Sequence, residues 1–247
     1  MSAPTRFNSG FTQANSYQPL GTIGIPDPFF YAAFWDDFLA YNASNYTVTA
    51  ASGSVAATAA NGIGGRILFT TGATATNFAE IQLSTAGFQV TSGKKLSFLC
   101  RLQVANITTS AIIAGLISQN TTPFTAVADG IYFSKAAAST NIVLTVTTGS
   151  VIIGSVTISG ALTAATDIDL GFHLTPSGNL KVYAAANLEG AKRPNTANLG
   201  PNYTLSNSAL TGVLTTALLT PTLAISNGAT AAAMTGVADF LLAAQER

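Results

Sequence analysis

The chain has 247 residues, of which 48% are hydrophobic and only 8% are charged, whereas charged residues make up roughly 25% of ordinary soluble proteins. Ten Lys and Arg balance ten Asp and Glu, and this balance excludes the basic surface that nucleic acid or anionic lipid would require. So weakly charged a surface favours association, as in proteins that work within an assembly.

The first element is a segment without regular periodicity. Residues 4–30 read PTRFNSGFTQANSYQPLGTIGIPDPFF, and Pro and Gly interrupt a sequence rich in aromatic and aliphatic side chains. Such a segment cannot bury its own apolar groups, yet it is too hydrophobic for a solvated disordered tail. We therefore predict an extended N-terminal arm over residues 1–33 that contacts another protein chain. The side chains expected to make this contact are Phe7, Phe11, Tyr17, Leu20, Ile23 and Ile25.

From about residue 34 the sequence changes to short runs with a period of two, bounded by Gly, Asn, Ser and Pro, as expected for β-strands. In chain order the runs are GRILFTTG (65–72), AEIQLS (79–84), KKLSFLCRLQVA (94–105), AIIAGLIS (111–118), DGIYFSK (129–135), NIVLTVTTGSVIIGSVTI (141–158), DIDLGFHL (167–174), NLKVYAA (179–185), PTLAISNG (221–228) and GVADFLLAAQ (236–245). The run 141–158 holds two strands joined by a hairpin turn at Thr148-Gly149-Ser150. No window shows a helical period with caps, so few helices are expected.

These eleven or more strands predict an all-β fold in which two antiparallel sheets pack face to face. Their number favours a lectin-like jelly roll, here over residues 34–247, rather than an immunoglobulin-type sandwich. The alternation assigns the following side chains to the core: Leu96, Phe98, Cys100, Leu102, Val104, Ile168, Leu170, Phe172 and Leu174. Residues 186–217 fit poorly, and we expect a long loop there that is functional or ordered by a partner.

Candidate catalytic residues are few. His173 is the only histidine, and we expect it on the polar surface of its strand, ~13 Å along the strand from Asp169. A Ser-His-Asp relay would need partners from elsewhere in the chain, and no G-x-S-x-G motif presents a serine. Cys100 is the only cysteine, which excludes an intrachain disulfide, and its place on an apolar face predicts a buried, inert thiol.

The acidic residues do not form a clear catalytic pair. If FWDDF is a strand, Asp36 and Asp37 point to opposite faces and do not form a catalytic pair. The roles open to them are a polar residue at a strand edge, a turn cap or a calcium ligand. Asp167 and Asp169 have the spacing of two carboxylates on one strand face, but no aromatic sugar platform accompanies them. Trp35 is the only tryptophan in the chain. We therefore expect no enzymatic activity.

The sequence shows no pattern typical of a cofactor site or of a membrane-spanning segment. No metal-ligand cluster is evident, so we expect no metal and no cofactor. The glycines of NGIGG (61–65) lie between strands and indicate a turn rather than a phosphate loop. No run reaches the ~18 apolar residues of a membrane span, and the start lacks the apolar core of a signal peptide. We expect synthesis in a cytoplasm.

Several stretches together resemble a family of tailed-bacteriophage structural proteins with a lectin-like jelly-roll body and an extended N-terminal arm. They are the arm (4–28) with FWDDF (34–38), residues 64–83 with 93–116, residues 129–146, and residues 219–247. The resemblance implies a non-enzymatic capsid cement or decoration protein on the outer surface of a virion. It implies binding to the major capsid protein and self-association, as a homotrimer or next as a dimer. The segment 186–217 is longer, and charges are scarcer, than in that family.

Two further hypotheses stay open, because one sandwich fold hosts many functions. The first alternative is a carbohydrate-binding, lectin-like module on a phage head or tail, and the second is an enzyme that degrades polysaccharides. Sugar sites require exposed aromatic and paired polar groups, and glycosidases require converging carboxylates. Both are sparse in the sequence, which favours the structural reading.

Overall fold

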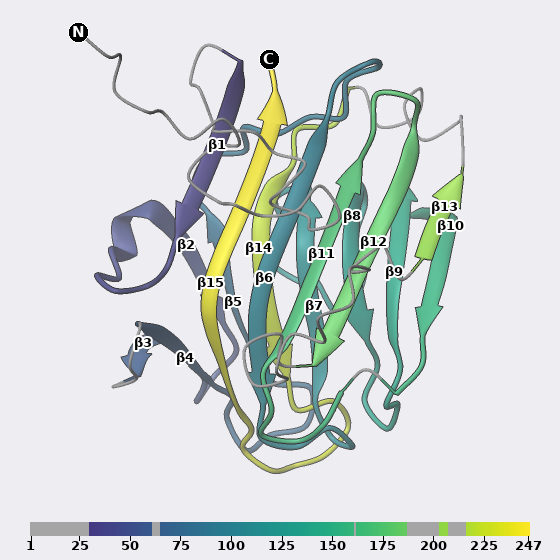
Figure 1. Ribbon diagram of the computed structural model, residues 1–247. Helices are drawn as coiled ribbons and strands as arrows, with labels where there is room; N and C mark the ends of the chain where they lie inside the picture. Colours follow the sequence, from purple (N-terminus) through teal and green to yellow (C-terminus); the bar gives the residue numbers. More distant parts are fainter. Residues whose placement is uncertain (1–29, 61–64, 161, 187–202, 207–215) are drawn as a thin grey trace, which may run out of the picture.

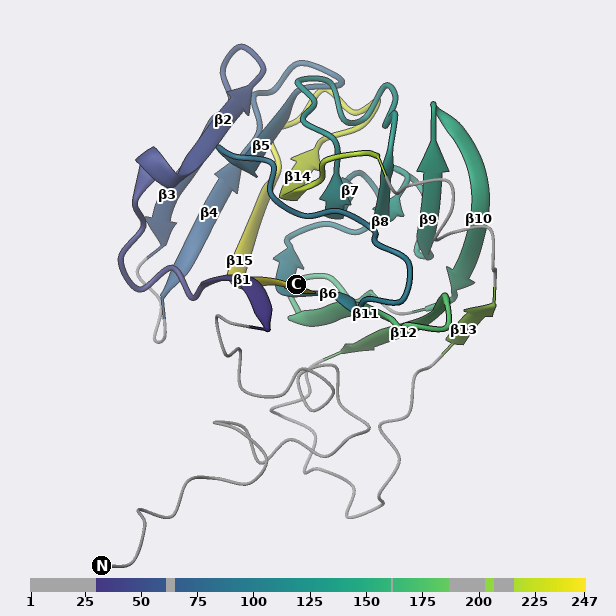
Figure 2. The same ribbon diagram turned by 90° about the horizontal axis from the view of Figure 1, so that it is seen from above.

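The computed structural model describes residues 30–60, 65–160, 162–186, 203–206 and 216–247 (Figure 1). Within these ranges the chain forms fifteen β-strands and one short 3-10 helix, Ala43–Asn45. The strands build two antiparallel sheets that pack face to face, and Figure 2 shows the two layers from above. The prediction of an all-β, lectin-like sandwich is confirmed. The described residues contain no helix long and apolar enough to span a membrane.

The eight-stranded sheet has the order β13-β12-β11-β6-β15-β4-β3, and β1 pairs with the second half of β15. Its strands are β1 (Tyr31–Asp36), β3 (Val55–Ala60), β4 (Arg66–Thr70), β6 (Leu96–Val104), β11 (Ile168–Leu174), β12 (Asn179–Ala186), β13 (Tyr203–Ser206) and β15 (Thr235–Glu246). Because β15 is twelve residues long, it pairs with β4 near its start and with β1 near its end.

The seven-stranded sheet has the order β10-β9-β8-β7-β14-β5-β2. Its strands are β2 (Tyr46–Ala50), β5 (Phe78–Leu83), β7 (Ala111–Ile117), β8 (Gly130–Lys135), β9 (Ile142–Thr148), β10 (Val151–Ile158) and β14 (Thr220–Ser226). β9 and β10 form the predicted hairpin, in which Thr148 pairs with Val151. The two turn residues between them, Gly149 and Ser150, have φ of 53° and 65°, as a two-residue hairpin turn of the favoured twist requires.

The main core lies between the two sheets and contains the side chains that alternation assigned to it. Phe98 of β6 stacks on Phe172 of β11 with ring centroids 5.6 Å apart. Phe133 of β8 approaches Phe172 from the opposite sheet at 6.4 Å. All three rings are fully buried, and each such side chain stabilises the fold by about 1.5–3 kcal/mol. These aromatic contacts join the two layers near their centre.

Two boundaries differ from the sequence-based expectation. The sandwich begins at Tyr31 rather than at residue 34, because Tyr31, Ala32 and Ala33 pair with the end of β15. Strand β13 lies inside the segment expected to be a loop, and pairs with β12. It lies beside β10 at one side of the sandwich (Figure 2), where a Cβ on Gly154 would be 2.9 Å from Leu205. Strand β13 thus pairs with β12 in its own sheet, and its Leu205 packs against Gly154 of β10 in the other sheet.

Candidate functional site

The outer face of the seven-stranded sheet is unusual because it is buried over its central strands β7 and β14. In β7, Ile112, Ala114 and Leu116 face the main core, so Ile113 and Ile117 face outward. These two nevertheless are 5% and 0% exposed. They belong to a second apolar cluster with Val127, Tyr132 and Ala224, against which Phe124 packs. Something other than the opposite sheet therefore covers this face.

The cover is the β7–β8 loop, residues 118–129. The backbone N–H of Ser118 donates to the carbonyl of Asp129 at 2.9 Å, which holds the two ends of the loop together. The loop contacts β5 as well as its own cluster. The Asn120 N–H donates to Oε1 of Gln82 at 3.0 Å, and the ring of Phe124 lies 6.0 Å from that of Phe78. The loop thus lies across the sheet from β8 to β5.

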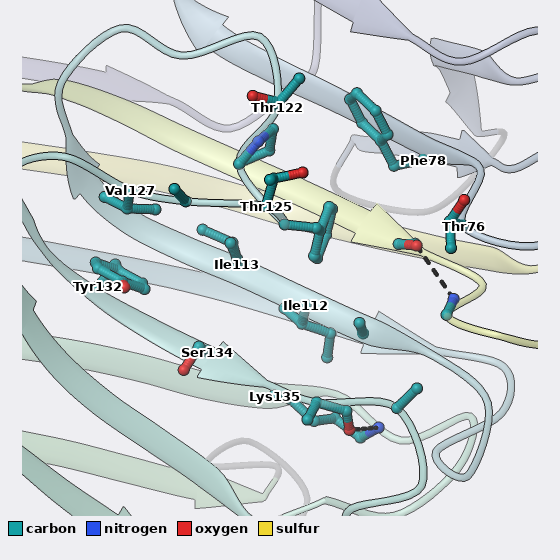
Figure 3. Close-up of a pocket in the computed structure, with 18 of the residues that line it drawn as sticks. Thr76, Phe78, Ile112, Ile113, Thr122, Thr125, Val127, Tyr132, Ser134 and Lys135 are labelled. Atoms are coloured by element: carbon teal, nitrogen blue, oxygen red, sulfur yellow. Dashed lines mark hydrogen bonds between the residues drawn. The ribbon is translucent and has the colours of Figure 1, made fainter. Parts of the chain in front are cut away.

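Beside this loop the face is hollowed into a cavity of about 670 Å³. Figure 3 shows Thr76 and Phe78 on one side of it, Thr122 and Thr125 on the loop, and Ser134 with Lys135 across from them. The cavity lies where β7 begins and where β8 and β14 end, since neighbouring strands run antiparallel. Its lining combines the aromatic side chains of Phe78, Phe124 and Tyr132 with hydroxyl groups on several elements.

The rim of the cavity holds one backbone conformation that is rare for its residue type. Thr76 has φ of 66°, in the left-handed region that a β-branched side chain seldom adopts. Its N–H donates to the carbonyl of Gly228, which has φ of 57° and also lines the cavity. Outliers of this kind gather at binding and catalytic sites, where surrounding structure holds them in place. The exposed Thr76 side chain lies at the cavity mouth, where its hydroxyl donates to the Ala75 carbonyl at 2.6 Å.

Lys135 contributes the cationic group in the lining. Its side chain is 2% exposed, and Nζ donates to the carbonyls of Ser110 and Ala136. Burial lowers the pKa of Lys135 to about 8. Because backbone carbonyls already take up this amine, it fixes the end of β8 rather than presenting a free charge to a ligand.

Glu80 lies next to the cavity on the same face of β5 as Phe78. It is completely buried, and neither of its carboxyl oxygens has a hydrogen-bond partner among the described residues. Burial raises the pKa of Glu80 to about 8, so the carboxyl group is mostly protonated at neutral pH. An unpartnered buried carboxyl group requires an explanation, because nearly all such groups in proteins are hydrogen-bonded.

The structure confirms the predicted burial of Cys100 and corrects the predicted exposure of His173. Cys100 is fully buried in the core, and burial raises the pKa of its thiol well above the ordinary value. His173 lies on the outer face of β11 as expected, but it is 3% exposed rather than a surface residue. Its Nδ1 lies 2.7 Å from Oγ of Ser97, a neighbour on β6 that sequence reasoning did not identify.

The Ser97–His173 pair is a structural contact rather than a catalytic dyad. Both side chains are buried, so a substrate would not reach the hydroxyl group. Desolvation, with the nearby charges of Lys181 and Lys95, lowers the pKa of His173 to about 4. The imidazole is therefore neutral, and Asp169 is engaged elsewhere.

Asp167 and Asp169 form ion pairs on the eight-stranded sheet, on the opposite side of the molecule from the cavity. Oδ2 of Asp167 lies 2.8 Å from Arg66, and both oxygens of Asp169 accept hydrogen bonds from Arg101, at 2.7 and 3.2 Å. Arg101 also contacts Asp239 at 3.3 Å. Two carboxylates neutralised by arginines in this way are not poised to attack a sugar.

Asp36 and Asp37 cap the turn that follows β1. Oδ1 of Asp36 accepts the Phe38 N–H at 2.8 Å, and Oδ1 of Asp37 accepts the N–H of Leu39 at 3.3 Å. Phe38 has φ of 54°, which these two bonds help to hold. Oδ2 of Asp36 accepts the Tyr46 hydroxyl at 2.7 Å, and burial together with this bond raises the pKa of Tyr46. Of the roles considered for this pair, the structure confirms the turn cap.

The predicted arm residues, Phe7, Phe11, Tyr17, Leu20, Ile23 and Ile25, lie outside the described residues. Within the described part of the chain, no group of three or more His, Cys, Asp or Glu could hold a metal ion. The cavity itself escaped sequence reasoning, because its lining comes from four strands and four loops. One signal was present: Glu80 interrupts an otherwise uncharged strand, AEIQLS.

Comparisons with known proteins identify the fold but no family. No protein-family model matches the chain, and neither does any curated protein. An endo-1,3-β-glucanase from Streptomyces sioyaensis is similar, with a TM-score of 0.58 at 13% identity over 99% of this chain and 99% of that one. A Lotus tetragonolobus seed lectin has a TM-score of 0.58 at 8% identity over 87% of this chain and 99% of that one.

A third similar structure is the lectin UEA-II complexed with galactose. Its TM-score is 0.56 at 12% identity, over 86% of this chain and 98% of that one. At such low identities the likeness shows the fold alone. The chain thus has the jelly-roll sandwich that these lectins and this glucanase share.

Proposed function

We propose that this protein is a non-catalytic carbohydrate-binding module that holds a saccharide in the cavity on the outer face of the seven-stranded sheet. The observation that carries the proposal is the lining of that cavity. It places the aromatic side chains of Phe78, Phe124 and Tyr132 around a hollow rimmed by the hydroxyl groups of Thr76 and Thr122. Ligand sites are typically such concave, mostly apolar pockets with a few placed polar groups.

The chemistry of this lining suits a neutral sugar. An aromatic ring packs against the C–H face of a sugar, while hydroxyl groups exchange hydrogen bonds with the sugar's own hydroxyls. Among the described residues that line the cavity, Lys135 is the one cation, and its amine is already bonded to backbone carbonyls. The fold adds support, since the similar structures include a lectin bound to galactose and a glucanase.

The absence of catalysis is part of the proposal, and the carboxyl groups support it. Glycoside hydrolysis ordinarily uses two carboxyl groups placed on either side of the scissile bond. Among the described residues, Glu80 is the carboxyl group next to the cavity, and it is buried beneath the outer surface. Asp167 and Asp169, the other spaced pair, are bound to arginines on the opposite sheet.

The test is calorimetric titration of the purified protein with galactose, β-1,3-glucan oligosaccharides and β-1,3-1,4-glucan oligosaccharides. We expect at least one to bind, and no new reducing ends to appear on long incubation. Phe124→Ala should weaken binding at least tenfold, because it removes a ring from the cavity. The matched control is Phe30→Ala, which removes an exposed ring on the eight-stranded sheet. Equal affinities for the two variants, or no binding to any saccharide, would refute the proposal.

A second candidate function is supported by an exposed apolar surface around β1. Phe30, Trp35 and Leu39 are 63%, 67% and 69% exposed, within ten residues of one another. A contiguous exposed apolar patch typically marks a protein–protein contact, and these three side chains offer apolar area for such a contact. Together with the low charge, they favour the virion structural role that the sequence resemblance implies. That role places the protein on the outer capsid surface, bound to the major capsid protein as a homotrimer or next as a dimer.

This candidate has its own experiment. Deletion of residues 2–30 leaves every described strand intact, so the truncated sandwich should melt close to the full chain. Burying each apolar arm side chain is worth ~1.5–3 kcal/mol, so the deletion should abolish binding to capsids and self-association. A truncated protein that still binds capsids, or one that cannot fold, would contradict this division of roles. Carbohydrate binding by the same truncated protein would be unaffected.

A further inference from the structure

The floor of the cavity continues beneath the β7–β8 loop as a strip of polar side chains. Phe78 and Ser226, which line the cavity, are paired across β5 and β14. The next outward-facing pair along the two strands is Glu80 with Ala224, and the pair after it is Gln82 with Thr222. Successive pairs on one face are about 6.6 Å apart along a strand. The strip therefore leads directly away from the cavity.

Polar side chains on the outer face of a sheet ordinarily contact water, but these do not. Glu80, Gln82 and Thr222 are 0%, 2% and 0% exposed. Nε2 of Gln82 donates to Oγ1 of Thr222 at 2.9 Å, and Oε1 of Gln82 accepts the Asn120 N–H. Glu80 alone of the three has no hydrogen-bond partner among the described residues. A neutral carboxyl group that can both donate and accept is left without either bond.

The loop covers Glu80 from above, as its contacts with the neighbours of Glu80 show. Phe124 contacts Phe78 on one side along β5 and packs against the cluster that contains Ala224. Asn120 contacts Gln82 on the other side. The loop seals the strip without satisfying its carboxyl group.

The β7–β8 loop is held together by its own hydrogen bonds. The Asn120 side chain bridges it internally, because its Oδ1 accepts the Thr122 N–H at 2.8 Å and its Nδ2 donates to the Ala126 carbonyl. Its two ends meet at the Ser118–Asp129 backbone bond. A compact loop with paired ends can swing about those ends while its internal bonds persist. Outside the loop, Asn120 bonds to Gln82 of β5, and Nε2 of Gln119 donates to the carbonyl of Ser84, just after β5, at 3.0 Å. Near the other end of the loop, the carbonyl of Ala128 accepts the Ser150 N–H at 2.8 Å.

We propose that the β7–β8 loop is a lid, and that its opening exposes Glu80, Gln82 and Thr222 as a second subsite for a further unit of the bound saccharide. This inference rests on the proposed carbohydrate-binding function. In the open state the carboxyl oxygens of Glu80 accept hydrogen bonds from sugar hydroxyls, while Gln82 offers its amide to donate and accept further ones. A strip of a carboxyl group, an amide and a hydroxyl suits an uncharged sugar and no anion.

The first test compares β-1,3-glucan oligosaccharides of about two and about six units. Glu80→Leu keeps the volume but removes the polar group, so it should weaken binding of the long oligosaccharide at least tenfold and leave the short one unchanged. Glu80→Gln, which still donates and accepts, should restore the long oligosaccharide's affinity. Unchanged affinity of Glu80→Leu for both lengths would overturn the subsite while the cavity proposal stands. A folded wild type that binds neither length, and neither galactose nor β-1,3-1,4-glucan oligosaccharides, would refute the proposed function and the subsite with it.

The second test needs no saccharide. Thr222→Cys, in a Cys100→Ala background, places a thiol beneath the lid at a position that is fully buried. If the lid opens, a thiol reagent should label this cysteine at least a hundredfold faster than the protein unfolds globally. The matched control is Cys100 of the wild type, buried between the sheets, which should be labelled only at the rate of global unfolding. Equal labelling rates at the two positions would overturn the lid.

Discussion

Replacing Glu80 by Gln should remove a large part of the pH dependence of stability. The carboxyl group has its pKa raised by burial from 4.5 to about 8 in the folded protein. The unfolded chain therefore loses this proton at a lower pH than the folded protein does. It follows that the free energy of unfolding is highest below pH 4.5 and falls as the pH rises through 8, after which it levels off.

The magnitude follows from the difference between the two pKa values. Each unit is worth about 1.4 kcal/mol, so the full loss is about 5 kcal/mol, of which about 4 kcal/mol falls between about pH 5 and about pH 9. Glu80→Gln has a side chain of the same shape that does not titrate. The difference in the free energy of unfolding between Glu80→Gln and the wild type should therefore grow by about 4 kcal/mol, in favour of the variant, between about pH 5 and about pH 9.

The assay is guanidinium unfolding of both proteins at a series of pH values. His173 and Lys135, whose pKa values burial lowers to about 4 and about 8, also contribute to the pH dependence. Their contributions are present in both proteins and cancel in the difference. Parallel curves for wild type and Glu80→Gln would refute the reasoning, since Glu80 would then titrate alike in both states.

Three further changes test the sandwich itself. Gly115→Ala should destabilise the fold by about 1–3 kcal/mol, because the added Cβ would lie 2.4 Å from the backbone of β8. Gly87→Ala is the control: its added Cβ would have nothing within 4 Å, so it should be nearly neutral in the same denaturation assay. Asp169→Ala should cost about 3–5 kcal/mol by removing two hydrogen bonds that neutralise the buried Arg101, and a cost below about 1 kcal/mol would show that the pair is solvated. In the native protein, Cys100 should resist a thiol reagent, and rapid modification would contradict its burial.

The sequence by itself determined the strands and the faces of the longest ones. In β6 and β11 the alternation of apolar and polar residues identified the core side, and Phe98 and Phe172 stack there. The Gly149-Ser150 turn was also predictable, because a two-residue hairpin needs residues that tolerate positive φ. These features depend on neighbours a few positions apart, so local sequence is enough to specify them.

Other features were decided only by the tertiary structure. β7 and β14 are buried on both faces, so no alternation marks their outer side, and the cover over β7 comes from a loop. His173 lies on the polar face of its own strand, but in the folded protein it is buried next to Ser97 of β6. Strand β13 is too short for its pattern to stand out within a long segment.

The candidate site depended most on long-range pairing. Phe78, Phe124 and Ser226 come from distant parts of the chain and meet only when β5, β7, β8 and β14 are ordered in one sheet. Glu80 was visible in the sequence as a charge in an apolar strand, but a surface position would have looked the same. Its burial, and hence its raised pKa, is a property of the loop that closes over it. Local sequence specified the strands, whereas their order and the loop above them produced the cavity.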